Sequence, residues 1–106
     1  MSKFLVTGSY TADGAKALAK EGGSQRKVAV EKMVGALGGK VEAFYFAFGD
    51  SDIYVIIDVP DTASGAALSL AVNASGMVKL NTVMLMTPEE VDAACKKSVN
   101  YRAPGQ

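Results

Sequence analysis

Residues 41–59 read VEAFYFAFGDSDIYVIIDV and carry the strongest secondary-structure signal in the chain. Two runs rich in aromatic and β-branched residues, Val41–Phe48 and Ile53–Val59, flank a short segment, GDSD, at residues 49–52. Such runs are typical of β-strands, and a Gly/Asp/Ser segment between two of them is typical of a turn. The stretch therefore predicts a central β-hairpin.

The predicted hairpin has two chemically different faces. A turn of two or four residues, the common even lengths, places the three phenylalanines of the first run opposite aliphatic residues of the second. The facing pairs are Phe48 with Ile53, Phe46 with Val55, and Phe44 with Ile57. We expect this face to form the core, because its cross-strand pairs are all large and apolar.

The opposite face of the hairpin is mixed but still largely apolar. It carries Ala43, Tyr45 and Ala47 on one strand and Tyr54, Ile56 and Asp58 on the other. The outer strands are expected to add Leu5, Val83 and Leu85. A monomer rarely leaves such a patch open to water. We therefore expect a two-fold homodimer that buries this exposed sheet face against its copy.

Outward from the hairpin, the remaining pattern completes the order β-α-β-β-α-β-α. Alternating or apolar runs at Lys3–Tyr10 and Val78–Met86 predict the two outer strands. The expected helices begin near Thr11, at a Ser24 cap, after Pro60 and at a Thr87 cap, and they end near Glu21, Gly38, Ser75 and Lys97. Two split β-α-β halves predict a ferredoxin-like α+β sandwich, in which helices cover one face of a four-stranded antiparallel sheet. We expect residues 1–106 to form one domain, with residues 98–106 as a C-terminal tail.

The composition excludes several classes of function. The 106 residues include 11 basic and 11 acidic side chains, so no net charge attracts nucleic acid or an anionic membrane. The chain has no histidine, which removes Ser-His-Asp and Cys-His catalysis, His-ligated haem and most zinc sites. Cys95 is the single cysteine, and we expect no disulfide, no metal and no cofactor. The first apolar run breaks at Thr7–Ser9, too early for a signal peptide, and we expect a cytoplasmic location.

Arg26 is the most unusual of the polar residues. A cation in the first turn of a helix opposes the helix dipole, which is positive at that end. The residue is either an ordinary surface arginine or an anion clamp that acts together with the helix amides. In the second case a small-molecule pocket needs further polar groups. The candidates are Tyr10, Tyr45, Tyr54 and Asp58, although the tyrosines have a competing interpretation as packing groups across the dimer.

Five stretches of the chain resemble the GYD domain family in their order and spacing. They are Phe4–Thr11 (FLVTGSYT), Glu21–Arg26 (EGGSQR), Gly38–Gly49 (GGKVEAFYFAFG), Asp52–Asp61 (DIYVIIDVPD) and Thr87–Glu90 (TPEE). Gly49 and Asp52 match the turn motif of that family, Gly-x-Tyr-Asp, whereas Ser51 stands where the tyrosine is expected. The resemblance implies a ferredoxin-like fold of the dimeric α/β-barrel type, and it implies no established activity.

Together these features favour a homodimeric small-molecule-binding or accessory protein without metal or prosthetic group. One alternative is a cofactor-free monooxygenase or isomerase that acts on a small metabolite, and another is a structural interaction module. The space between sheet and helices distinguishes them. Polar groups that converge in a closed cavity favour an enzyme, an open pocket favours binding, and a filled space favours the structural role.

Overall fold

Four strands form one antiparallel sheet, in the spatial order β2-β3-β1-β4, in a computed structural model that describes residues 1–106. The strands are β1 (Ser2–Tyr10), β2 (Lys40–Phe46), β3 (Ile53–Val59) and β4 (Val78–Leu85). The helices are α1 (Ala12–Glu21), α2 (Gly23–Ala36), α3 (Thr62–Ala74) and α4 (Pro88–Cys95). This α+β architecture with an open antiparallel sheet confirms the predicted ferredoxin-like fold.

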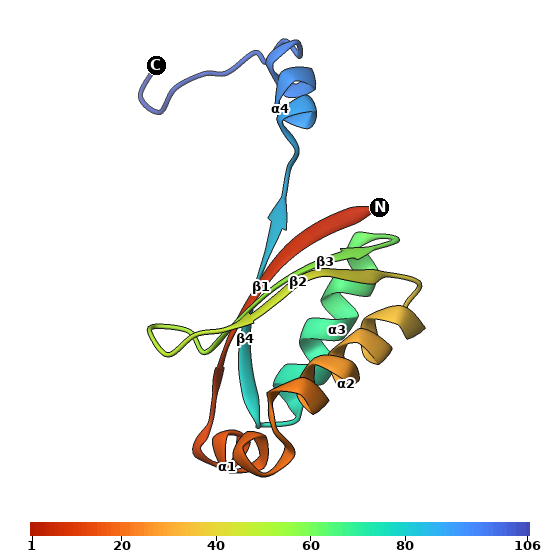
Figure 1. Cartoon of the computed structure of the whole chain (residues 1–106). Helices are drawn as coiled ribbons and strands as arrows, with labels where there is room; N and C mark the ends of the chain where they lie inside the picture. Colours follow the sequence, from red (N-terminus) through yellow and green to blue (C-terminus); the bar gives the residue numbers. More distant parts are fainter.

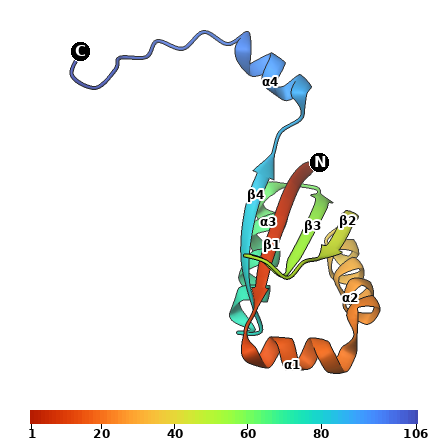
Figure 2. The same cartoon turned by 60° about the vertical axis from the view of Figure 1, so that its left-hand side comes forward.

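Helices α2 and α3 cover one face of the sheet, and the opposite face carries no helix (Figure 1). A second view shows the four strands side by side, with α1 crossing below them between β1 and α2 (Figure 2). The core consists of eight buried hydrophobic residues: Phe4, Val6, Val34, Ile53, Val55, Ile57, Val59 and Leu68. Six of them occupy alternate positions of the two central strands, so the period of two decides which face the helices cover. None of the four helices is long and apolar enough to cross a bilayer.

The hairpin turn lies one residue earlier than the sequence indicated, and the predicted register was wrong. Phe46 pairs with Ile53 and Phe44 with Val55, which shifts the pairing by two residues. An even shift keeps the side chains from Ala43 to Phe46 on their predicted faces, whereas an irregularity between Val41 and Ala43 changes the alternation at the start of β2 and packs Val41 against the core. Phe48, however, leaves the strand for the turn and is 90% exposed, so it is not part of the core.

Asp52 is the physical reason for this shift. Its backbone N–H donates to the Gly8 carbonyl oxygen at 2.7 Å, and its carboxylate accepts from the Tyr10 N–H at 2.9 Å. Its own carbonyl oxygen accepts from the Ala47 N–H at 2.8 Å. The neighbouring strand β1 therefore holds Asp52 as an extension of β3, and the turn closes over residues 48–51.

Helix α2 begins without the predicted Ser24 cap. The cap is Gly22, which has a φ of 91° and provides no side chain to accept a hydrogen bond. Its N–H donates to the Leu18 carbonyl oxygen at 2.7 Å, while its own carbonyl oxygen accepts from the Arg26 N–H at 3.2 Å. Gly22 thus ends α1 and starts α2. This double role needs a positive φ, which glycine adopts readily because it has no Cβ.

The C-terminal part of the chain stands apart from the rest of the molecule. Beyond β4, helix α4 and the tail project away from the sheet in both views (Figures 1 and 2). The molecule measures 56 × 33 × 22 Å and has a radius of gyration of 16.9 Å. A closely packed chain of this length has a radius of about 13 Å. The predicted Thr87 capping box is confirmed, because the Thr87 and Glu90 side chains each accept from the other's backbone N–H.

Candidate ligand-binding site

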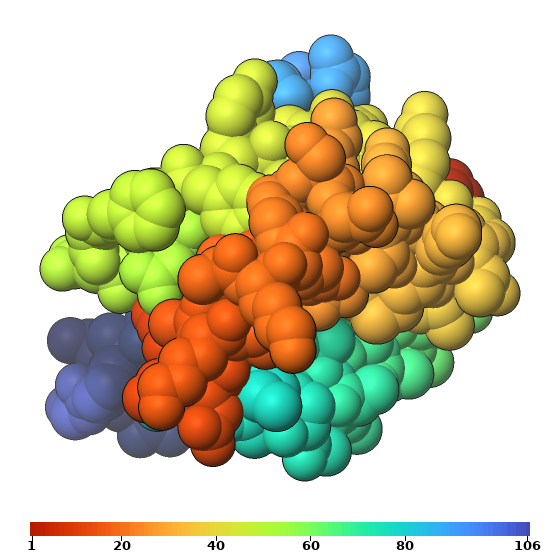
Figure 3. Space-filling model, turned by 60° about the horizontal axis from the view of Figure 1, so that its bottom comes forward, coloured from red at the N-terminus to blue at the C-terminus, as the bar shows by residue number.

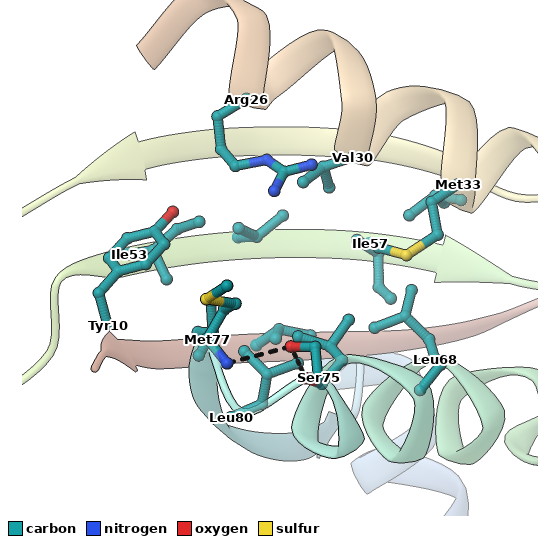
Figure 4. A pocket seen from close by; sticks show the side chains of 16 residues that line it. Tyr10, Arg26, Val30, Met33, Ile53, Ile57, Leu68, Ser75, Met77 and Leu80 are labelled. Carbon is teal, nitrogen blue, oxygen red and sulfur yellow. Dashed lines mark hydrogen bonds between the residues drawn. The ribbon is translucent and has the colours of Figure 1, made fainter. Parts of the chain in front are cut away.

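A cavity of about 330 Å³ lies between the helix-covered face of the sheet and helices α2 and α3. Sixteen residues line it, and 14 of them are hydrophobic. Its walls include Val30 and Met33 of α2, Ile53 and Ile57 of β3, and Leu68 of α3 (Figure 4). Ligand pockets in proteins are mostly apolar and have volumes of about 300–1,000 Å³. The cavity therefore has the character of a small ligand pocket.

Residues far apart in the sequence line one end of this cavity, which lies toward the end of the molecule formed by α1 and the hairpin turn. Seen from the end of the molecule at which α1 lies, α1 and α2 (orange) sit beside α3 (teal), and the hairpin turn (yellow-green) protrudes next to them (Figure 3). Tyr10, the last residue of β1, and Arg26, in the first turn of α2, line the cavity at this end (Figure 4). The Tyr10 hydroxyl and the Arg26 guanidinium thus lie at the same end of the pocket.

Arg26 contains an unsatisfied buried donor. Its Nε atom is shielded from solvent and has no hydrogen-bond partner. Oε2 of Glu21 lies 3.8 Å from Nε, so the two side chains form an ion pair at the partly exposed edge of the pocket, but this distance is beyond hydrogen-bond length and leaves Nε without an acceptor. Buried polar groups in native proteins are nearly always hydrogen-bonded, and a missing partner costs about 1–3 kcal/mol. The position therefore favours an acceptor supplied from within the cavity.

The Tyr10 hydroxyl is held in its protonated form. Burial raises the pKa of Tyr10, and although the Arg26 charge opposes this shift, the Glu21 and Asp52 carboxylates add to it. A phenol with a raised pKa remains a hydrogen-bond donor near neutral pH. In Figure 4 its hydroxyl points toward the Arg26 guanidinium across the cavity. Tyr10 and Arg26 together present donors, and a negatively charged group is the acceptor that suits them.

Ser75, the remaining polar residue of the lining, is already engaged. Its hydroxyl donates to the Val72 carbonyl oxygen at 2.6 Å and accepts from the Met77 N–H at 3.2 Å. These bonds close the C-terminal end of α3. No carboxylate lines the cavity.

The structure separates the candidate site residues into two groups. Tyr10 and Arg26 line the cavity, whereas Tyr45, Tyr54 and Asp58 belong to the face of the sheet that carries no helix. Tyr45 and Tyr54 pair across β2 and β3 and are 70% and 39% exposed. The five residues therefore do not share a single pocket.

The turn-motif residues also lie outside the cavity lining. Gly49 is in the exposed hairpin turn, and Asp52 holds the end of β1 through the hydrogen bonds described above. Ser51, at the position where the resemblance expects a tyrosine, lies in the same turn. Asp52 therefore does not line the pocket, but its carboxylate fixes the position of Tyr10 by accepting a hydrogen bond from the Tyr10 backbone N–H.

Val30 and Met33 were missed as lining residues. Together with Arg26 they follow the spacing i, i+4, i+7, which places all three on one face of a helix. The signal was thus present in the sequence. It became useful only with the knowledge that this face of α2 overlies a cavity.

A charged cluster occupies one end of the open sheet face. The Lys3 ammonium contacts the Glu42 carboxylate and lies 3.3 Å from Oδ2 of Asp58. A side-chain hydrogen bond with Glu42 and the ion pair with Lys3 lower the pKa of Asp58, although its burial acts in the opposite direction. The same two carboxylates raise the pKa of Lys3.

The substitution Asp58→Asn tests this cluster by its dependence on pH. A carboxylate with a lowered pKa stabilises the folded state above the unfolded pKa of about 3.9, and this contribution disappears as the pH falls through the folded pKa. Wild type should therefore be more stable than Asp58→Asn near neutral pH. The difference should shrink in acid. Urea unfolding of both proteins at neutral pH and in acid measures this difference in stability. A difference that does not depend on pH would contradict the proposed ionic role.

The fold and the cavity define a class: a small ferredoxin-like α+β protein with an apolar pocket that has one cationic end. The model of the GYD domain family matches residues 4–95, and the chain therefore belongs to this family. The match runs from β1 through α4 and confirms the resemblance seen in the sequence. No curated protein and no solved structure matches the chain.

Proposed function

We propose that this protein binds a small, mostly apolar molecule that carries one anionic group. The observation that supports this proposal most strongly is the solvent-shielded, unpartnered Nε of Arg26 at one end of a hydrophobic cavity. The anionic group accepts hydrogen bonds from Arg26 and Tyr10, and the apolar part fills the space beside Met33 and Leu68.

The size of the cavity restricts the ligand. A cavity of about 150 Å³ accommodates benzene. The volume here, about 330 Å³, is roughly twice as large. It suits a bicyclic aromatic carboxylate or an alkyl carboxylate of similar bulk.

The residues that line the cavity support ligand binding better than they support acid–base catalysis. The cavity lining holds no carboxylate, and Tyr10, its only phenol, has a raised pKa that makes it a poor general base at neutral pH. The unfilled volume also favours a ligand over a purely structural module, because protein interiors are otherwise closely packed.

The proposed assembly is a homodimer formed through the open face of the sheet. Tyr45, Tyr54 and Val83 on this face are exposed, and Leu5 and Ile56 lie between them on the central strands. Covering such a surface with a second copy removes apolar area from water on both subunits. The ligand pocket lies on the opposite side of the sheet, so the two parts of the proposal are independent.

Arg26→Ala tests the ligand proposal with 2-naphthoate, a bicyclic anion, and 2-naphthylmethanol, its neutral analogue. Loss of a charge-assisted hydrogen bond should weaken naphthoate binding by about ten- to a hundredfold, or about 1.5–3 kcal/mol. Binding of the alcohol should change little. Calorimetric titration or NMR titration measures both affinities.

Lys27→Ala is the matched control, because Lys27 is the next residue of α2, is exposed and does not line the cavity. It should leave both affinities unchanged. Equal affinities of wild type for the anion and the alcohol would contradict the anionic requirement. Absence of binding by both compounds would contradict the proposed ligand class.

A further inference from the structure

The C-terminal arm, defined as residues 86–106, has almost no contact with the remainder of its own chain. Helix α4 makes at most marginal contact with any other helix or strand. Every residue from 88 to 102 is exposed. The exposed side chains include the large apolar residues Met86, Val91, Val99 and Tyr101. Packing these groups against another surface is favourable, because it removes their apolar area from water.

Helix α4 is too short to be stable without packing. Isolated helices below about 12–15 residues are marginal in water, and α4 has eight residues. Val91, Ala94 and Cys95 follow the spacing i, i+3, i+4 and share one face, on which small side chains permit close approach. No helix or strand of the same chain makes more than marginal contact with α4. The family match nevertheless includes α4 up to Cys95, so this helix is part of the domain.

The connection to the sheet directs α4 away from its own body. Thr87 precedes a proline and has extended backbone angles, with φ of −76° and ψ of 158°. The capping box then starts the helix at Pro88 with a defined orientation. Beyond α4 the tail extends on the side of the sheet opposite to α2 and α3 (Figure 1). That is the side on which a second copy lies in the proposed homodimer.

We propose that the two subunits exchange their C-terminal arms, so that α4 and the tail of each protomer pack on the partner subunit. This inference rests on the homodimer proposed above and is independent of the ligand pocket. The exchange supplies the apolar surface that α4 lacks in its own chain. It also extends the interface beyond the open sheet face.

The substitution Val91→Asp tests the exchange in the full-length chain. A carboxylate on the packed face of α4 should weaken dimerisation by about tenfold or more, because the charge must be desolvated in the interface. Leu70→Asp is the matched control, since Leu70 is 72% exposed on α3, away from both the arm and the open face. It should leave the dimer dissociation constant unchanged. Sedimentation velocity over a dilution series measures all three proteins.

The outcomes separate the arm from the sheet face. A fourth protein, Ile56→Asp, places a charge at the centre of the open sheet face, opposite Leu5. If Val91→Asp dimerises as tightly as wild type while Ile56→Asp is monomeric, the face dimer stands and the arm exchange is overturned. A monomeric wild type overturns both, whereas the naphthoate experiment still decides the pocket. The core lies within residues 4–68, so Val91→Asp is expected to remain folded.

A second measurement distinguishes exchange between subunits from packing within one chain. One protein carries the substitutions Cys95→Ser and Asn100→Cys and is spin-labelled at position 100. It is mixed with an equal amount of the ¹⁵N-labelled Cys95→Ser protein, which carries no spin label. Both positions are exposed. Exchange predicts broadened amide signals in the strands of the ¹⁵N-labelled chain. Absence of broadening between chains in a confirmed dimer overturns the proposal.

Discussion

Phe4→Ala is expected to lower the free energy of unfolding by about 3–5 kcal/mol. Phe4 lies in the central strand β1 and is 6% exposed. Its ring lies against Gly65 of α3, so closely that a methyl group added to Gly65 would approach the ring to 2.7 Å. Removal of the ring leaves a cavity between the sheet and α3. Because Gly65 has no side chain that could move into this cavity, the space stays unfilled. Urea or thermal unfolding measures the loss.

Phe48→Ala provides a control of identical chemistry. The sequence indicated that Phe48 belongs to the same core face, but the structure places it in the turn with 90% exposure. Its substitution should change stability by less than about 0.5 kcal/mol, as is usual for surface sites. Similar losses for the two variants would contradict the observed hairpin register.

Gly14→Ala is expected to destabilise the protein by about 1–3 kcal/mol or more. The Cβ of an alanine at this position would lie 1.9 Å from the Met77 carbonyl oxygen, a backbone atom that cannot move alone. The same oxygen accepts hydrogen bonds from the Thr11 N–H at 3.0 Å and from the Thr11 hydroxyl at 3.2 Å. The contact thus joins the start of α1 to the segment before β4, beside the ligand pocket.

Gly35→Ala is the matched control and should have the opposite sign. Gly35 also lies within a helix, α2, but a Cβ at this position would meet nothing within 4 Å beyond the backbone of its own helix. Alanine is favoured over glycine in a helix by up to about 1 kcal/mol. Stability should therefore rise by about 0.5–1 kcal/mol. A loss at Gly35 as large as that at Gly14 would show that packing against Met77 is not the cause.

The candidate site was predictable only in part. Alternation along β1 places Tyr10 on the same face as Phe4 and Val6, so its position on the helix side was accessible from the sequence. The same alternation places Tyr45 and Tyr54 on the other side of the sheet. A pocket that combined all three tyrosines conflicted with this pattern, and the structure separates them accordingly.

The sequence by itself determined the elements, the sides of the sheet and the start of the last helix. These features depend on local periodicity and on short-range capping, as at Thr87 and Glu90. The tertiary structure decided the position of the hairpin turn, because Asp52 forms its hydrogen bonds with Gly8 and Tyr10, more than forty residues away. It also decided the pocket: Arg26 and Tyr10 line the same cavity only once α2 packs against β2 on the helix-covered face of the sheet, and no local pattern encodes how elements so far apart in the sequence come together.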